Sequence, residues 1–206
     1  MSASTSESSK LLEQILASFV AKSVNVDDLP DDDPTAKLGK RCGELFTDGV
    51  DVLRSLIPND RIRAIARVVW DLVGNKHVLI TLGPDVPTLS FTAMRHGNVL
   101  QGLVMIPKEW PQMVENDTSF MQLGAILFVG VQIVDFCNDR LLGDQDAAAR
   151  TRAYEAELLI TLRQTLPSWK PNDYQRQILA RYPDGLDTTG VVLYPYKPYE
   201  ASQEST

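Results

Sequence analysis

Apolar residues recur along most of this chain with the spacing of α-helices. Over residues 8–23 they lie three and four positions apart and form one apolar face: Leu11, Leu12, Ile15, Leu16, Phe19 and Val20. The same spacing predicts four further helices, over 35–57, 60–73, 144–166 and 173–181. Glycines weaken the first of these, so a break near Gly49 is possible.

The middle of the chain changes to the two-residue period of β-strands. Residues 77–82 and 88–93 read as strands, and a turn at 96–98 leads into a third over 99–106. The helix that follows, over 118–142, is apolar on all sides, which is typical of a buried position. We therefore expect an α+β fold, mostly helical, with a small and partly antiparallel sheet packed on a central apolar helix.

The composition divides the chain into three parts. Residues 1–34 form a polar N-terminus, an amphipathic helix and an acidic, proline-containing linker. Residues 35–185 are predicted to form a single α+β domain. Residues 186–206 form an extended tail rich in tyrosine and proline, which could lie on the protein's own surface or bind a partner.

Charge and apolar content exclude several classes of protein. A net charge of −7 argues against nucleic-acid binding, which depends on Lys and Arg. The central helix contains Gln122, Gln132 and Asp135, and its longest apolar run is Leu123–Val131, so we expect no membrane span. The first residues lack the basic and apolar regions of a secretory signal peptide, and two cysteines make no disulfide framework. We expect a cytoplasmic protein.

The local sequences from 77 to 160 resemble the zincin-like fold of small, single-domain zinc metallopeptidases. The strand and hairpin unit of that family resembles residues 89–93, 97–100 and 104–107 here. The active-site helix resembles Leu123–Phe128 and the residues after it. A following helix, which in such families can supply a glutamate ligand, resembles Tyr154–Leu159.

This chain lacks the residues that would give the family its chemistry. The His-Glu-x-x-His positions correspond to Val129, Gly130 and Ile133, and neither Val129 nor Ile133 has a lone pair for a metal. A catalytic zinc needs three protein ligands, and only Glu155 or Glu157 remains. The resemblance therefore implies a pseudoenzyme with no metal site and no cofactor.

Three polar residues could still mark a cleft. Gln132 and Asp135 share one face of the central helix, and Glu155 lies on the next helix. They could form a polar pocket or a partner contact. The other interpretation, which we favour for Asp135, is a buried side chain paired with Arg150 or Arg152.

Three functions follow from these interpretations. The leading hypothesis is a non-catalytic zincin-like scaffold that binds a protein. The second is a hydrolase with an atypical site made of His77, His96, Asp135 and Glu155. The third is a structural subunit of a larger assembly, docked through the helix over 8–23.

Overall fold

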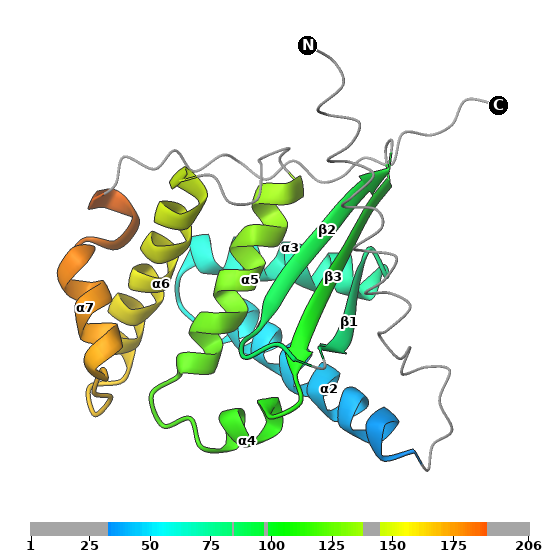
Figure 1. Cartoon of the computed structure of the whole chain (residues 1–206). Coiled ribbons are helices and arrows are strands. Elements are labelled where there is room, and N and C mark those ends of the chain that lie inside the picture. Colours follow the sequence, from blue (N-terminus) through cyan, green and yellow to red (C-terminus); the bar gives the residue numbers. More distant parts are fainter. Residues whose placement is uncertain (1–32, 84, 97–98, 138–144, 189–206) are drawn as a thin grey trace.

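The computed structural model describes residues 33–83, 85–96, 99–137 and 145–188 (Figure 1). The predicted helix over 8–23, most of the acidic linker and the tail beyond 188 lie outside these residues. The described helices are α2 (Pro34–Ser55), α3 (Asp60–Gly74), α4 (Trp110–Glu115), α5 (Met121–Cys137), α6 (Gln145–Thr165) and α7 (Asp173–Arg181), with a 3₁₀ turn, η2 (Gly185–Thr188). The strands are β1 (Val78–Gly83), β2 (Ser90–His96) and β3 (Val99–Pro107).

Polar side chains fix where several helices begin. The carboxylate of Asp33 accepts hydrogen bonds from the backbone N–H groups of Thr35 (2.6 Å) and Ala36 (3.3 Å), which caps α2. Asn59 caps α3 in the same way, and its amide also donates to Glu157 of α6 at 2.8 Å. The cap of α3 therefore also ties this helix to α6.

Helix α2 is continuous through Gly49, so the possible break there is absent. Gly49 is buried, and a Cβ added to it would lie 2.2 Å from Cδ1 of Ile126 in α5. The glycine lets α2 and α5 approach closely, and tertiary packing outweighs its low helix propensity.

Among the described residues, the sheet has three strands in the order β1-β3-β2. β3 pairs in parallel with β1 and antiparallel with β2, so the sheet is mixed. The predicted α+β class, mostly helical with a small and partly antiparallel sheet, is confirmed.

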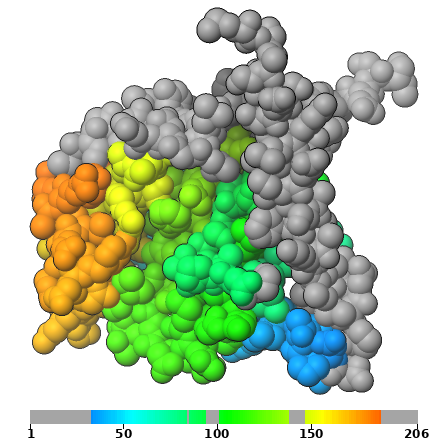
Figure 2. Space-filling view, in the orientation of Figure 1, coloured from blue at the N-terminus to red at the C-terminus, as the bar shows by residue number. Residues whose placement is uncertain are grey.

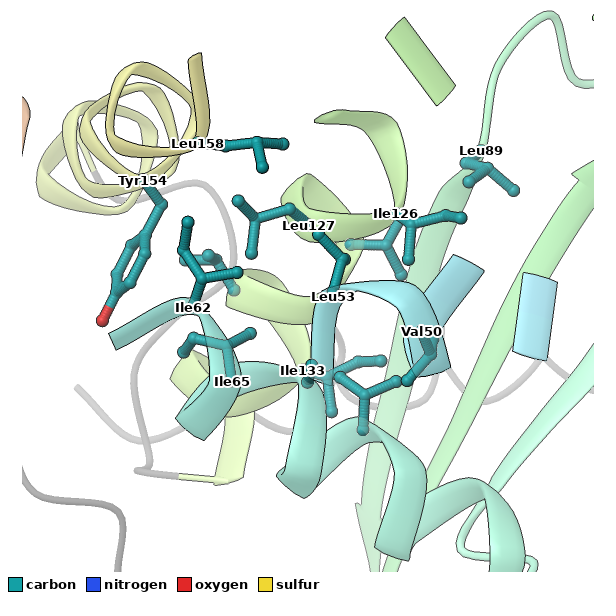
Figure 3. Packing of buried hydrophobic residues seen from close by; sticks show 14 of the residues in the cluster. Val50, Leu53, Ile62, Ile65, Leu89, Ile126, Leu127, Ile133, Tyr154 and Leu158 are labelled. Carbon is teal, nitrogen blue, oxygen red and sulfur yellow. The ribbon is translucent and has the colours of Figure 1, made fainter. Parts of the chain in front are cut away.

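Helix α5 lies at the centre of the molecule. It packs against α2, α3, α6 and the sheet (Figure 1), as its apolar sequence predicted. Figure 3 shows Leu127 and Ile133 of this helix among side chains of α2, α3 and α6. The helix begins at Met121 and not at Thr118, because Phe120 adopts a φ of 60° that cannot continue a right-handed helix. Within the described residues, no helix is both long and apolar enough to cross a membrane.

Candidate functional site

A pocket of about 210 Å³ lies between α5, α6, α7 and the segment that precedes β2. In Figure 2 these elements lie on the viewer's side, with α7 in orange, α5 in green and the segment before β2 in blue-green. Apolar walls come from Leu89, Met121, Ala125 and Phe128, and polar groups from Thr88, Arg152, Glu155 and Tyr174. A cavity of about 150 Å³ can hold a benzene ring, so this pocket has room for a medium-sized side chain.

Glu155 is the centre of the polar side of the pocket. Its side chain is 10% exposed, and its Oε2 accepts hydrogen bonds from Nη1 of Arg152 at 2.7 Å and from the hydroxyl of Tyr174 at 3.1 Å. Arg152 also donates to the Tyr174 hydroxyl. Its guanidinium lies over the rings of Phe128 (5.8 Å) and Tyr174 (5.6 Å). The carboxylate is therefore neutralised within a closed network of side chains.

The network perturbs the ionisation of its members. Burial, together with the charge and hydrogen bond of Glu155, raises the pKa of Tyr174 to about 12, and Arg152 only partly opposes this. Burial lowers the pKa of Arg152, but the hydrogen bond and charge of Glu155 outweigh it and raise that pKa above its usual range. Near neutral pH Tyr174 is a neutral phenol and Arg152 a cation.

One oxygen of Glu155 is oriented toward α5. A Cβ added to Gly124 would lie 3.9 Å from Oε1 of Glu155, which is ordinary van der Waals distance. Met121, Gly124, Ala125 and Phe128 are spaced three and four apart, so one face of α5 forms this wall. The absence of a side chain at Gly124 leaves the space beside Glu155 open.

The predicted ligand-like positions lie on other faces of α5. Val129, Gly130 and Ile133 are all buried, and none of them lines the pocket. A Cβ on Gly130 would lie 3.0 Å from Ile65 and 3.2 Å from Val69 of α3. Figure 3 shows Ile133 on the side of α5 that faces α2 and α3. The structure therefore does not bring these three positions together with Glu155.

Asp135 and Arg150 form a buried ion pair. Nε of Arg150 lies 3.1 Å from both carboxylate oxygens of Asp135, and Nη2 lies 2.8 Å from one of them. The predicted pairing of Asp135 with an arginine of the next helix is confirmed. Neither Asp135 nor the half-buried Gln132 lines the pocket, so of the three candidate cleft residues only Glu155 does.

His96 lies at the far end of the sheet from this pocket, and His77 lies partway along it, next to Val78, which is level with Ala93. His77 immediately precedes β1 and His96 ends β2, whereas Leu89, which lines the pocket, precedes the start of β2. The six steps along β2 span about 20 Å. The described residues contain no group of three or more His, Cys, Asp or Glu side chains placed to hold a metal ion. The residues of the hypothetical hydrolase site are not brought together.

Tyr174 is the member of the Glu155 network that the sequence did not reveal. It lies 19 positions from Glu155 on a separate short helix, and nothing in its local sequence indicates a partner. Gln175 beside it is buried and donates to the Ser119 carbonyl at 2.7 Å, which fixes α7 against the start of α5. This contact places Tyr174 at the pocket.

Comparisons with known proteins do not add an assignment. No family model matches the chain, and neither the curated proteins nor the solved structures include a match.

Proposed function

We propose that this chain is a non-catalytic, zincin-like scaffold that binds a protein partner in the pocket around Glu155. The observation that carries the proposal is the chemistry of this pocket. Its one carboxylate is paired with Arg152 and Tyr174, and the facing wall of α5 offers Met121, Gly124, Ala125 and Phe128, none of which is a catalytic zinc ligand or a nucleophile.

The proposed kinship requires a different register from the one that the sequence suggested. If α5 corresponds to the active-site helix of a zincin, its positions nearest Glu155 are Gly124 and, one turn later, Phe128. Val129 and Ile133 would then be core positions. The consequence for catalysis is the same, because a glycine and a phenylalanine cannot replace two histidine ligands.

The pocket favours an uncharged, partly apolar group from a partner. The ion pair of Arg152 with Glu155 has no net charge, so a buried ammonium or carboxylate would bring an uncompensated charge with it. Leu89 and Phe128 provide apolar contact area. Oε1 of Glu155 can accept one hydrogen bond, so an apolar side chain next to a peptide N–H group fits this chemistry.

Metal analysis tests the non-catalytic half of the proposal. Protein purified without a chelator is expected to contain zinc at far below one ion per chain. Stoichiometric zinc that resists dialysis would refute the pseudoenzyme interpretation.

Filling the pocket tests the binding half. Gly124→Leu places a side chain in the pocket without a backbone clash, since the nearest atom to the new Cβ is 3.9 Å away. Gly43→Leu is a matched control, because Gly43 is also a helical glycine and, apart from its own helix backbone, no atom lies within 4 Å of its Cβ position. Both changes should raise helix propensity similarly.

The probe is a displayed library of short peptides selected on the purified wild-type protein. Selected peptides should bind wild type and Gly43→Leu alike, and Gly124→Leu at least about tenfold more weakly, a loss of roughly 1.4 kcal/mol. Peptides that bind all three proteins equally, or a library that yields no binder, would contradict a pocket that binds a protein partner.

A further inference from the structure

One face of the sheet has no described helix packed on it. Because side chains alternate along a strand, Leu79, Thr81, Ser90, Thr92, Leu103 and Met105 share this face, which we call the outer face. The opposite face belongs to the main core, where Val78, Val104 and Ile106 are buried. There Phe91 meets Phe136 of α5 edge to face, with ring centroids 6.2 Å apart.

The outer face is nevertheless closed to solvent over part of its area. Leu103 is 9% exposed and Thr81 is 8% exposed, yet Leu103 is not part of the main core cluster. The loop before β2 covers one end, where a Cβ on Gly83 would lie 2.4 Å from Val86. No described helix covers the rest of this face, where Leu79 is 42% exposed. A sheet commonly buries the apolar side chains of a face against a second layer.

Two hydroxyl groups on this face have no hydrogen-bond partner. The Oγ1 of Thr81 and the Oγ of Ser90 are both buried and unpaired. They lie in one row across the sheet, since Thr81 and Ser90 are both register partners of Met105. A buried, unsatisfied polar group is costly and calls for an explanation. The described residues therefore leave this row of the outer face without its hydrogen-bond partners.

We propose that residues 8–23 pack as an amphipathic helix on the outer face of the same chain. Their apolar face, formed by residues such as Leu12, Leu16 and Phe19, supplies the missing layer. A helix of this length spans about 24 Å, comparable to the roughly 30 Å of β3.

The connection to α2 permits this arrangement within one chain. Residues 24–32 separate the segment from the N-cap Asp33, and nine extended residues reach about 30 Å. In Figure 1, α2 begins near the end of the sheet where β1 and β3 finish. This inference does not depend on the proposed function, and it assigns the N-terminal segment to the protein's own fold instead of a docking role.

The test measures coupling between the two surfaces in the full-length protein. In one background, Leu12→Ser, Leu16→Ser and Phe19→Ser together remove the apolar face of the segment. The destabilisation by Met105→Ala is then compared between this background and wild type. Met113→Ala is the control, because Met113 is also half-buried but packs on the main core from α4.

The expected result is a smaller effect of Met105→Ala on the folding equilibrium constant in the serine background, by at least about threefold. The effect of Met113→Ala should be the same in both backgrounds. Equal effects of Met105→Ala in the two backgrounds would overturn the proposal. So would a coupling that appears only at high protein concentration together with a dimeric mass, because a second copy would then supply the helix.

Discussion

Replacing Arg150 by methionine is expected to reduce the free energy of unfolding by about 3–5 kcal/mol. The side chains of Arg150 and Asp135 are only 10% and 7% exposed, and three N···O distances of 2.8–3.1 Å join them. Without the guanidinium, the Asp135 carboxylate stays buried and loses the bidentate contact with Arg150 that offsets much of its desolvation. The cost is mainly that of the remaining charge and not of the lost attraction.

The double variant Asp135→Leu with Arg150→Met separates the cost of a buried, unpaired charge from the loss of the attraction between the two side chains. It removes both charges and keeps apolar volume at the contact, so its stability should lie within about 1 kcal/mol of wild type or above it. The single change Asp135→Leu should cost about 3 kcal/mol or more, since it leaves Arg150 unpaired. The sum of the single effects would then exceed the double effect by several kcal/mol.

Urea unfolding followed by circular dichroism measures all four free energies. Single-variant effects that add within about 0.5 kcal/mol would refute the reasoning, because they would show that the pair is not coupled. The cycle also bears on function. If Asp135 served a binding cleft, the double variant would keep its stability but lose the peptides selected on the wild type. A purely structural pair predicts that it retains them.

Three further changes test the packing and the pocket. The pKa of Tyr174, raised to about 12, lies above the value of an unfolded tyrosine, so its contribution to stability is complete below pH ~10 and is lost between pH ~10 and ~12. The difference in tyrosinate absorbance between wild type and Tyr174→Phe should have its midpoint near pH 12, and a midpoint near pH 10 would contradict the network. Gly49→Ala should destabilise the protein by about 1–3 kcal/mol through its contact with Ile126. Gly43→Ala should stabilise it by up to about 1 kcal/mol. Unfolding temperatures of the two variants that shift in the same direction would disprove this. Gln175→Leu should cost about 1–3 kcal/mol in urea unfolding, because it removes one of the two donors to the Ser119 carbonyl, the other being Trp169, and the acceptor of the Asn172 N–H group; a neutral change would contradict that role.

Local periodicity was sufficient to predict most elements of this fold. The helices α2, α3 and α7 lie within one or two residues of their predicted ranges, because capping residues such as Asp33, Asn59 and Asn172 mark their starts. The mixed strand order could not be predicted from the sequence. Each strand pattern is local, whereas the pairing of β1 with β3 joins segments that lie on either side of β2 in the chain. Gly49 looked like a weak point because its partner, Ile126, is distant in the sequence.

The pocket was only partly predictable for a related reason. Glu155 could be singled out, but its partner Tyr174 is brought to it by the contact of α7 with the start of α5. Arg152 was considered as a partner for Asp135, and the structure gives that role to Arg150. These two arginines are two positions apart on α6 and therefore lie about 200° apart around its axis. The sequence gives no reason to assign either of them to a particular acid.

The register of helix α5 decides which of its side chains line the pocket, but it does not affect whether the helix can bind a metal. A helix that is apolar all round has no polar face to indicate its orientation, and a shift of one residue rotates a position by about 100° around the axis. The residues that form the pocket wall therefore depend on the register: Phe128 lines the pocket, whereas Val129, one residue later, is buried in the core. The lack of metal ligands is not sensitive to it, because no His, Cys, Asp or Glu occurs between Met121 and Val134 on any face. Any zinc site in this protein would therefore have to form without the central turns of α5.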